Sequence, residues 1–134
     1  MSFGTNTILT SAGRAITTNR LKNGATGATE PSFVGMGVGA TTAGRTAALA
    51  DTALSSAVGS RIAGTSTQQT SSGGTTNDTY QVVQLMTAAA AYSVDEAGLF
   101  DAVSAGNMYL SATFPVVSLS TGDSIQFTLK VQYS

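Results

Sequence analysis

Four of the seven carboxylates are the side chains best placed to do chemistry, because they lie in the C-terminal third of the chain: Asp95, Glu96, Asp101 and Asp123. Two carboxylates that face each other could hydrolyse a glycosidic bond. Clustered carboxylates and carbonyls could instead hold a hard cation such as Ca²⁺. However, the chain has no Trp, only five Phe and four Tyr, and no D-x-D-x-D-G loop. We therefore expect Asp101 and Asp123 to support turns and Glu96 to bond the backbone or a basic residue.

Nucleophilic and metal chemistry are limited by the residues that are missing. The chain contains no His and no Cys, which excludes Ser-His-Asp and Cys-His sites and an ordinary zinc site. A Ser-Lys site would need Lys22 or Lys130 buried beside a serine, and Lys130 lies on the outward phase of a predicted strand. Gly35, Gly37 and Gly39 resemble part of a dinucleotide loop, but Gly39 is not at the offset of the helix-opening third glycine of that motif, and no βαβ unit follows. We expect a strand with close backbone contacts there, no enzymatic activity and no cofactor.

Hydroxyl groups rather than charges supply most of the polarity. Ser and Thr account for 37 of the 134 residues, whereas charged residues make up only 10%, against about 25% in an average domain. The net charge of −1 offers no basic surface to a phosphate backbone, so we expect no nucleic-acid partner. The longest apolar run, 88–92, is too short to span a membrane, and the N-terminus does not look like a signal peptide. Low self-repulsion suits a protein that assembles with other chains.

The C-terminal half contains the elements that must position the acids. Apolar residues alternate with polar ones over 124–133, which predicts a half-buried antiparallel strand: Ile125, Phe127, Leu129, Val131 and Tyr133. We predict further strands over 33–38, 60–68, 80–87, 92–100 and 108–114, and a loop over 69–78. Short strands separated by turns predict a mainly β fold, namely an antiparallel β-sandwich of jelly-roll-like type.

The N-terminal part is predicted to differ from this sandwich. Apolar residues recur on one face of a helix over 7–21: Ile8, Leu9, Ala12, Ile16 and Leu21. Thr5 or Asn6 could cap this helix and Asn23-Gly24 could end it, while an extended arm is the alternative. We therefore divide the chain into an N-terminal helix or arm, 1–24, and a single β-sandwich domain, 25–134. Residues 46–58 could form a short helix or irregular chain.

The order of several short motifs resembles that of small structural proteins of tailed bacteriophages. The motifs are LTSAGR at 9–14, FVGMGVG at 33–39, DTAL at 51–54 followed by Arg61, NDTYQV at 77–82, VDEAGLFD at 94–101 and GDSIQF at 122–127. The similarity covers nearly the whole chain. The EAGLFD block also occurs in phage tail-fibre and collar proteins.

This resemblance implies a structural virion protein, and more narrowly a capsid cement protein. Such proteins are trimers that stabilise the shell by binding the major capsid protein. The small size of the chain, one domain without a fibre repeat, favours the capsid over the tail. One alternative is a tail-associated adaptor or decoration protein. Another, from a different class, is a small carbohydrate-binding adhesion module, which exposed Tyr or Trp platforms would favour.

Two segments are expected to contact a partner or another copy of the chain. The first is the N-terminal segment 1–21, and the second is the edge formed by 126–134. The expected interface residues are Phe3, Ile8, Leu9, Arg14, Ile16, Leu21, Phe127, Leu129 and Tyr133.

Overall fold

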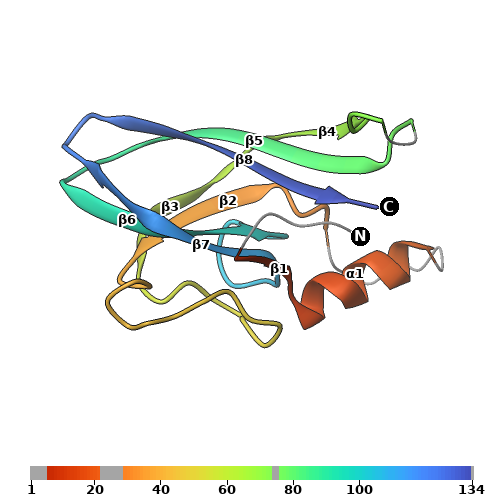
Figure 1. Ribbon diagram of the computed structural model, residues 1–134, viewed down its shortest axis with the longest axis horizontal. Helices are drawn as coiled ribbons and strands as arrows, with labels where there is room; N and C mark the ends of the chain where they lie inside the picture. Colours follow the sequence, from red (N-terminus) through yellow and green to blue (C-terminus); the bar gives the residue numbers. More distant parts are fainter. Residues whose placement is uncertain (1–5, 22–28, 74–75, 134) are drawn as a thin grey trace.

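The computed structural model describes residues 6–21, 29–73 and 76–133, which form two antiparallel sheets packed face to face (Figure 1). The five-stranded sheet has the order β1-β7-β6-β2-β3, and the three-stranded sheet has the order β4-β5-β8. The elements are β1 (Thr7–Leu9), α1 (Ser11–Leu21), β2 (Phe33–Val38), β3 (Ala57–Ala63), β4 (Thr65–Gln69), β5 (Thr79–Thr87), β6 (Tyr92–Phe100), β7 (Met108–Leu119) and β8 (Ser124–Gln132). The predicted mainly β sandwich is confirmed, while its jelly-roll type stays a prediction.

The core lies between the two sheets and follows the alternation of the strands. In β8, Phe127, Leu129 and Val131 are buried, whereas the residues between them are exposed. They meet buried residues of the larger sheet such as Val34 and Leu110. Side chains of a strand point alternately to its two faces, so the period-two pattern of 124–133 correctly predicted which face of β8 is buried.

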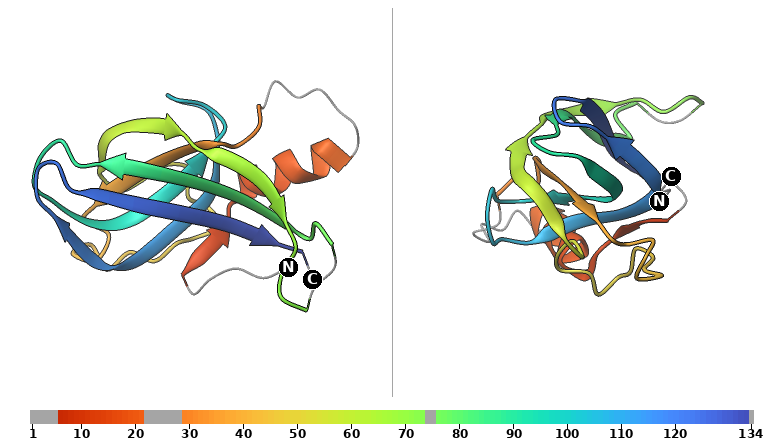
Figure 2. Two further views of the ribbon diagram at one scale, coloured as in Figure 1. Left: turned by 90° about the horizontal axis from the view of Figure 1, so that it is seen from above. Right: turned by 90° about the vertical axis from the view of Figure 1, so that its left-hand side faces the viewer.

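The segment predicted as one strand over 60–68 is two strands in different sheets. β3 pairs with β2 and β4 pairs with β5, and Gly64 alone separates them. A Cβ atom at Gly64 would lie 2.6 Å from Cγ1 of Val82, so the crossing needs a glycine. This crossing joins the sheets along one side, whereas β8 and β1 are edge strands (Figure 2).

The predicted N-terminal helix begins later than expected, because its first residues form β1 beside β7. Thr10 caps the helix in place of Thr5 or Asn6: its hydroxyl accepts a hydrogen bond from the Gly13 amide at 3.0 Å and donates one to the Met108 carbonyl. Leu9 and Ile16 belong to the same core as the two sheets. Residues 7–21 are therefore packed into the sandwich, and the predicted helix stop at Asn23-Gly24 lies outside the described residues.

Irregular chain covers the outer face of the five-stranded sheet. Residues 39–56 contain turns but no helix, which selects the irregular alternative for this segment, and they run beneath the sheet in Figure 1.

β7 continues past the predicted end at Phe114 to Leu119, and its register with β6 shifts opposite Asp95. This shift accommodates Pro115, which cannot donate to a ladder.

Replacing Gly13 tests how α1 docks on β7. A Cβ atom there would lie 2.4 Å from the Tyr109 carbonyl oxygen and 2.7 Å from Cδ1 of Leu9. We expect Gly13→Ala to lower the free energy of unfolding by about 1 to 3 kcal/mol through overpacking, although helix propensity alone would give a gain of about 1 kcal/mol. The control Ala15→Gly, on the exposed side of the helix, should lose about 1 kcal/mol. Urea denaturation measures both, and a more stable Gly13→Ala protein would contradict the close packing.

Candidate functional site

Each of the seven carboxylates accepts a hydrogen bond from the chain itself. Asp95 and Glu96 hold the segment that follows β2, and Asp51 lies within that segment. The others bond turns, loops or a tyrosine: Glu30, Asp78, Asp101 and Asp123. The expectation that Asp101 and Asp123 support turns and that Glu96 bonds the backbone or a basic residue is therefore confirmed.

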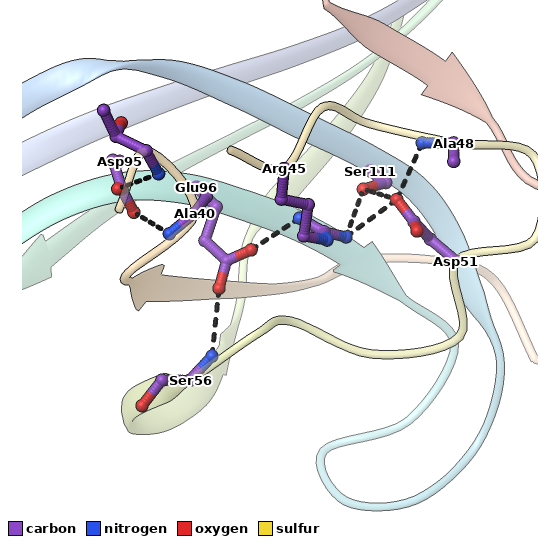
Figure 3. Close-up of polar contacts among 9 residues, drawn as sticks. Ala40, Arg45, Ala48, Asp51, Ser56, Asp95, Glu96 and Ser111 are labelled. Carbon is purple, nitrogen blue, oxygen red and sulfur yellow. Dashed lines mark hydrogen bonds and ion pairs between the residues drawn. The ribbon is translucent and has the colours of Figure 1, made fainter. Parts of the chain in front are cut away.

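Glu96 is fully buried and is held from two sides (Figure 3). Arg45 Nη1 donates to Glu96 Oε2 at 2.6 Å, and the Ser56 amide donates to Oε1 at 3.1 Å. The carboxylate occupies space that only a glycine leaves open, since a Cβ atom at Gly37 would lie 2.5 Å from Oε1. A buried carboxylate is tolerated only when it is paired and hydrogen-bonded, so this arrangement fixes the path of residues 45–56.

The same arginine also binds Asp51. The Arg45 Nη2 atom lies 2.7 Å from Asp51 Oδ2 and 3.3 Å from the Ser111 hydroxyl, which in turn donates to Asp51 Oδ2 at 2.6 Å. The Ala48 amide donates to the same oxygen at 2.9 Å. The network thus ties the covering segment to both β6 and β7. Sequence reasoning missed Arg45, although one arginine followed six residues later by an aspartate in an otherwise uncharged stretch could have suggested it.

Asp95 caps the turn that follows β2. The register of β6 shifts at Asp95 relative to both β2 and β7, and such a bulge re-aims a side chain. The Asp95 carboxylate accepts hydrogen bonds from the amides of Ala40 and Thr41 at 3.1 and 2.7 Å. Burial acts to raise the pKa of Asp95, but these hydrogen bonds outweigh it and hold that pKa below its ordinary value. Asp95 is therefore a backbone cap and stays ionised.

Asp101 and Arg61 organise the turn between β6 and β7. The Asp101 carboxylate accepts from the backbone and the side-chain amide of Asn107 at 2.6 and 2.8 Å. The Arg61 guanidinium lies 3.4 Å from the centre of the Phe100 ring and donates to the carbonyl of Ala102 at 3.1 Å. These contacts are structural, as a cation over an aromatic face is itself favourable.

The described geometry bears on the alternatives for catalysis, cations and nucleotides. Glycosidase chemistry needs two carboxyl groups facing a shared sugar site, whereas here Glu96 and Asp51 are paired with Arg45, and Asp95, Asp101 and Asp123 bond backbone amides of three different turns. Within residues 6–21, 29–73 and 76–133, no three acids gather as metal ligands would. Gly35 and Gly37 belong to β2, and an irregular turn rather than a helix follows. Lys130 is exposed on β8, as predicted, and Lys22 lies outside the described residues.

A cleft of about 670 Å³ lies between α1 and the strands and contains three of the four tyrosines. Its lining is mostly apolar: Ile16, Thr17, Arg20, Glu30, Pro31, Tyr80, Tyr109 and Tyr133. The Tyr80 and Tyr109 rings meet edge to face, with centres 6.3 Å apart. Volume and composition match those of small-molecule sites. No spacing in the sequence indicates this cleft, because its tyrosines come from three different strands or their ends.

The hydroxyls of two of these tyrosines are already held by the chain. Tyr80 donates to the Pro31 carbonyl at 2.8 Å, and the Tyr109 hydroxyl lies 3.0 Å from that of Thr17. Burial raises the pKa of both tyrosines, and Glu30 adds to the effect at Tyr80. Both side chains are therefore neutral at physiological pH, and they offer the cleft fixed ring surfaces rather than charge.

The structure separates the predicted interface residues into core and surface. Leu9, Ile16, Phe127 and Leu129 are buried within the chain's own core, so their interface role gives way to a structural one. Regularly spaced apolar residues give the same sequence pattern whether they face the chain's own core or a partner. The interface role stays a prediction for three residues that are accessible, half-buried Ile8 and exposed Arg14 and Tyr133. Phe3 and the Leu21 side chain lie outside what the structure describes.

Replacing the arginine of the network tests how strongly the covering segment depends on it. We expect Arg45→Met to lower the free energy of unfolding by about 3 to 5 kcal/mol, because it leaves Glu96 buried without its cation. The double variant with Glu96→Gln should recover about 2 kcal/mol relative to the sum of the single losses. The control Lys130→Met removes an exposed cation and should change stability by less than about 0.5 kcal/mol. Additive losses in a chemical denaturation cycle would contradict the pairing.

The comparisons with known proteins are negative. No protein-family model matches this chain, and neither a curated protein nor a solved structure was found to be similar to it. Among the described residues, no helix is long and apolar enough to cross a membrane.

Proposed function

We propose that this chain is a non-enzymatic structural protein of a bacteriophage virion, and that it serves as a capsid cement protein. One observation carries the proposal: several residues of the phage-like motifs make the contacts that hold the covering segment and the turns of this fold. Asp51 binds Arg45, Arg61 stacks on Phe100, and Glu96 fixes the covering segment. A shared order of fold-determining residues supports a shared fold, and the resemblance then supplies the virion role by analogy.

The surface chemistry is compatible with docking onto protein. Carboxylates are engaged within the chain, so exposed strand faces present hydroxyls and amides, as in the Thr128 and Gln126 side chains of β8. Such surfaces associate through many modest contacts, and a standard interface buries about 1,600 Å² in total. A protein that binds the assembled shell better than its free subunits stabilises that shell by mass action. The proposed partners are the major capsid protein and, in a homotrimer, other copies of this chain.

Copy number in purified particles of the phage that encodes this chain tests the proposal. Quantitative mass spectrometry against the major capsid protein should find hundreds of copies for a cement protein. A dozen or fewer copies would place the protein at the tail tip or neck, which is the tail-associated alternative. Copies in multiples of six at high number would indicate a tail sheath position. Absence of the chain from washed particles that retain their known structural proteins would refute a virion role.

The tyrosine cleft favours a second candidate, a carbohydrate-binding adhesion module. Tyr133 is 43% exposed, and its ring lines the cleft together with the charged side chains of Glu30 and Arg20. Aromatic faces with a few polar groups at the rim are a typical ligand site, and a sugar ring could stack on them.

Titration with saccharides tests this second candidate. If it holds, neutral hexoses and short host glycans should shift the NMR signals of Tyr133 and Thr17 in a saturable way. Tyr133→Ala should weaken that binding at least tenfold, whereas Tyr92→Ala, outside the cleft, should not change it. Unchanged spectra at millimolar saccharide would contradict the carbohydrate-binding hypothesis and would not affect the virion proposal.

A further inference from the structure

The edge of β8 differs from the other strand edges of the described chain. β1 has three residues and β4 has five, so both are short. The outer part of β7 contains Pro115 beside a register shift, and β3 contains a register shift and Gly59 at φ +69°. Short length, proline and bulges are the usual protections of an edge. By contrast, β8 has nine residues and pairs with β5 from Ser124 to Gln132 without a shift.

The backbone N–H and C=O groups of β8 point alternately toward β5 and toward the open edge. The Tyr133 amide donates to the Asp78 carbonyl, and Tyr133 lies opposite Asp78 in the β5–β8 register. In an antiparallel ladder, hydrogen-bonded and non-hydrogen-bonded pairs alternate. The odd-numbered residues of β8 therefore bond β5, and the even-numbered residues direct their N–H and C=O groups outward. No hydrogen bond from the described part of the chain reaches those outward groups.

We propose that two copies of this chain pair antiparallel through β8, about a two-fold axis at Thr128, and so form a continuous six-stranded sheet. This inference goes beyond the proposed function, because it gives a contact strand and a two-fold register, neither of which the proposed homotrimer specifies. Thr128 is the middle residue of β8, so this register overlaps the whole strand. It aligns all five outward-facing residues, which could exchange about ten backbone hydrogen bonds.

The side chains of β8 fit the same register. Its single charge, Lys130, would lie opposite Gln126 of the second copy, so no like charges meet. A register centred on Lys130 would instead place two lysines opposite each other, which is unfavourable. Thr128 would face its own copy, and threonine pairs across strands are favourable. A self-complementary patch of this kind is what a two-fold contact requires.

Charge variants at Gln126 test both the pairing and its register. We expect analytical ultracentrifugation of the full chain to show a concentration-dependent dimer, or a hexamer if a trimer forms through another surface. Gln126→Glu should lower the dissociation constant of the β8 contact roughly fivefold, because two new Glu–Lys pairs form across the axis, and Gln126→Lys should raise it by a similar factor. The matched control Gln132→Glu adds the same charge to the same strand but faces Ser124, so it should change the constant less than twofold.

Hydrogen exchange gives an independent readout that needs no variant. The outward amides of Gln126, Thr128 and Lys130 should exchange slowly at high protein concentration and quickly at low concentration. Thr128→Pro, which removes only an outward N–H, should abolish the dimer. A monomer up to millimolar concentration, amides that exchange quickly at every concentration, or an oligomer insensitive to all β8 variants would overturn the inference. None of these results depends on whether the chain is found in virions.

Discussion

The buried carboxylate of Glu96 is the group on which the outer half of this structure depends. An ionised carboxyl without water costs several kcal/mol unless partners surround it, and here those partners come from a segment with no helix or strand of its own. Arg45 and the Ser56 amide both bond Glu96 on β6, so both ends of the segment 45–56 are held against the outer face of the sheet. This placement also brings the Leu49 carbonyl to the first amide of α1, at Ser11. One buried charge thus orders a long loop and supports a helix.

The low charge of the chain has a physical counterpart in this arrangement. Its few carboxylates serve as internal partners for amides, hydroxyls and arginines, in the positions that backbone caps and turns require. Hydroxyls and amides then supply the outer polarity. Such a surface repels other copies weakly and contains few charges that would fix one orientation over another. In the association proposed above, specificity would therefore come from shape and from backbone groups, and open strand edges are where backbone groups are available.

Regular alternation made part of this fold predictable. The buried face of β8 follows from its alternation, because side chains of a strand point alternately to its two faces, whereas the bounds of β2 follow from a short apolar run. Three features do not follow from local pattern. The split at Gly64 depends on contact with Val82, the helix start depends on Thr10 reaching Met108, and the tyrosine cleft joins distant strands. Each is a contact between residues far apart in sequence. Four residues predicted to lie in an interface are instead buried in the core. A hydrophobic pattern does not distinguish a residue that packs in the chain's own core from one that contacts a partner.

The motifs that resemble phage proteins contribute mainly to core strands and turns, so they support the fold rather than the choice of a partner. Asp51, Arg61 and Asp123 each bond within the chain, and none of these bonds would change if the outer surface were replaced. Related folds could therefore keep every motif while docking on different partners. The exposed strand positions lie outside these bonds, and they hold mostly Ser, Thr and Gln together with Lys130 and a few apolar side chains such as Leu85 and Val116. Under the proposed virion role, the partner would therefore be selected by these exposed positions, while the motifs would maintain the fold that presents them.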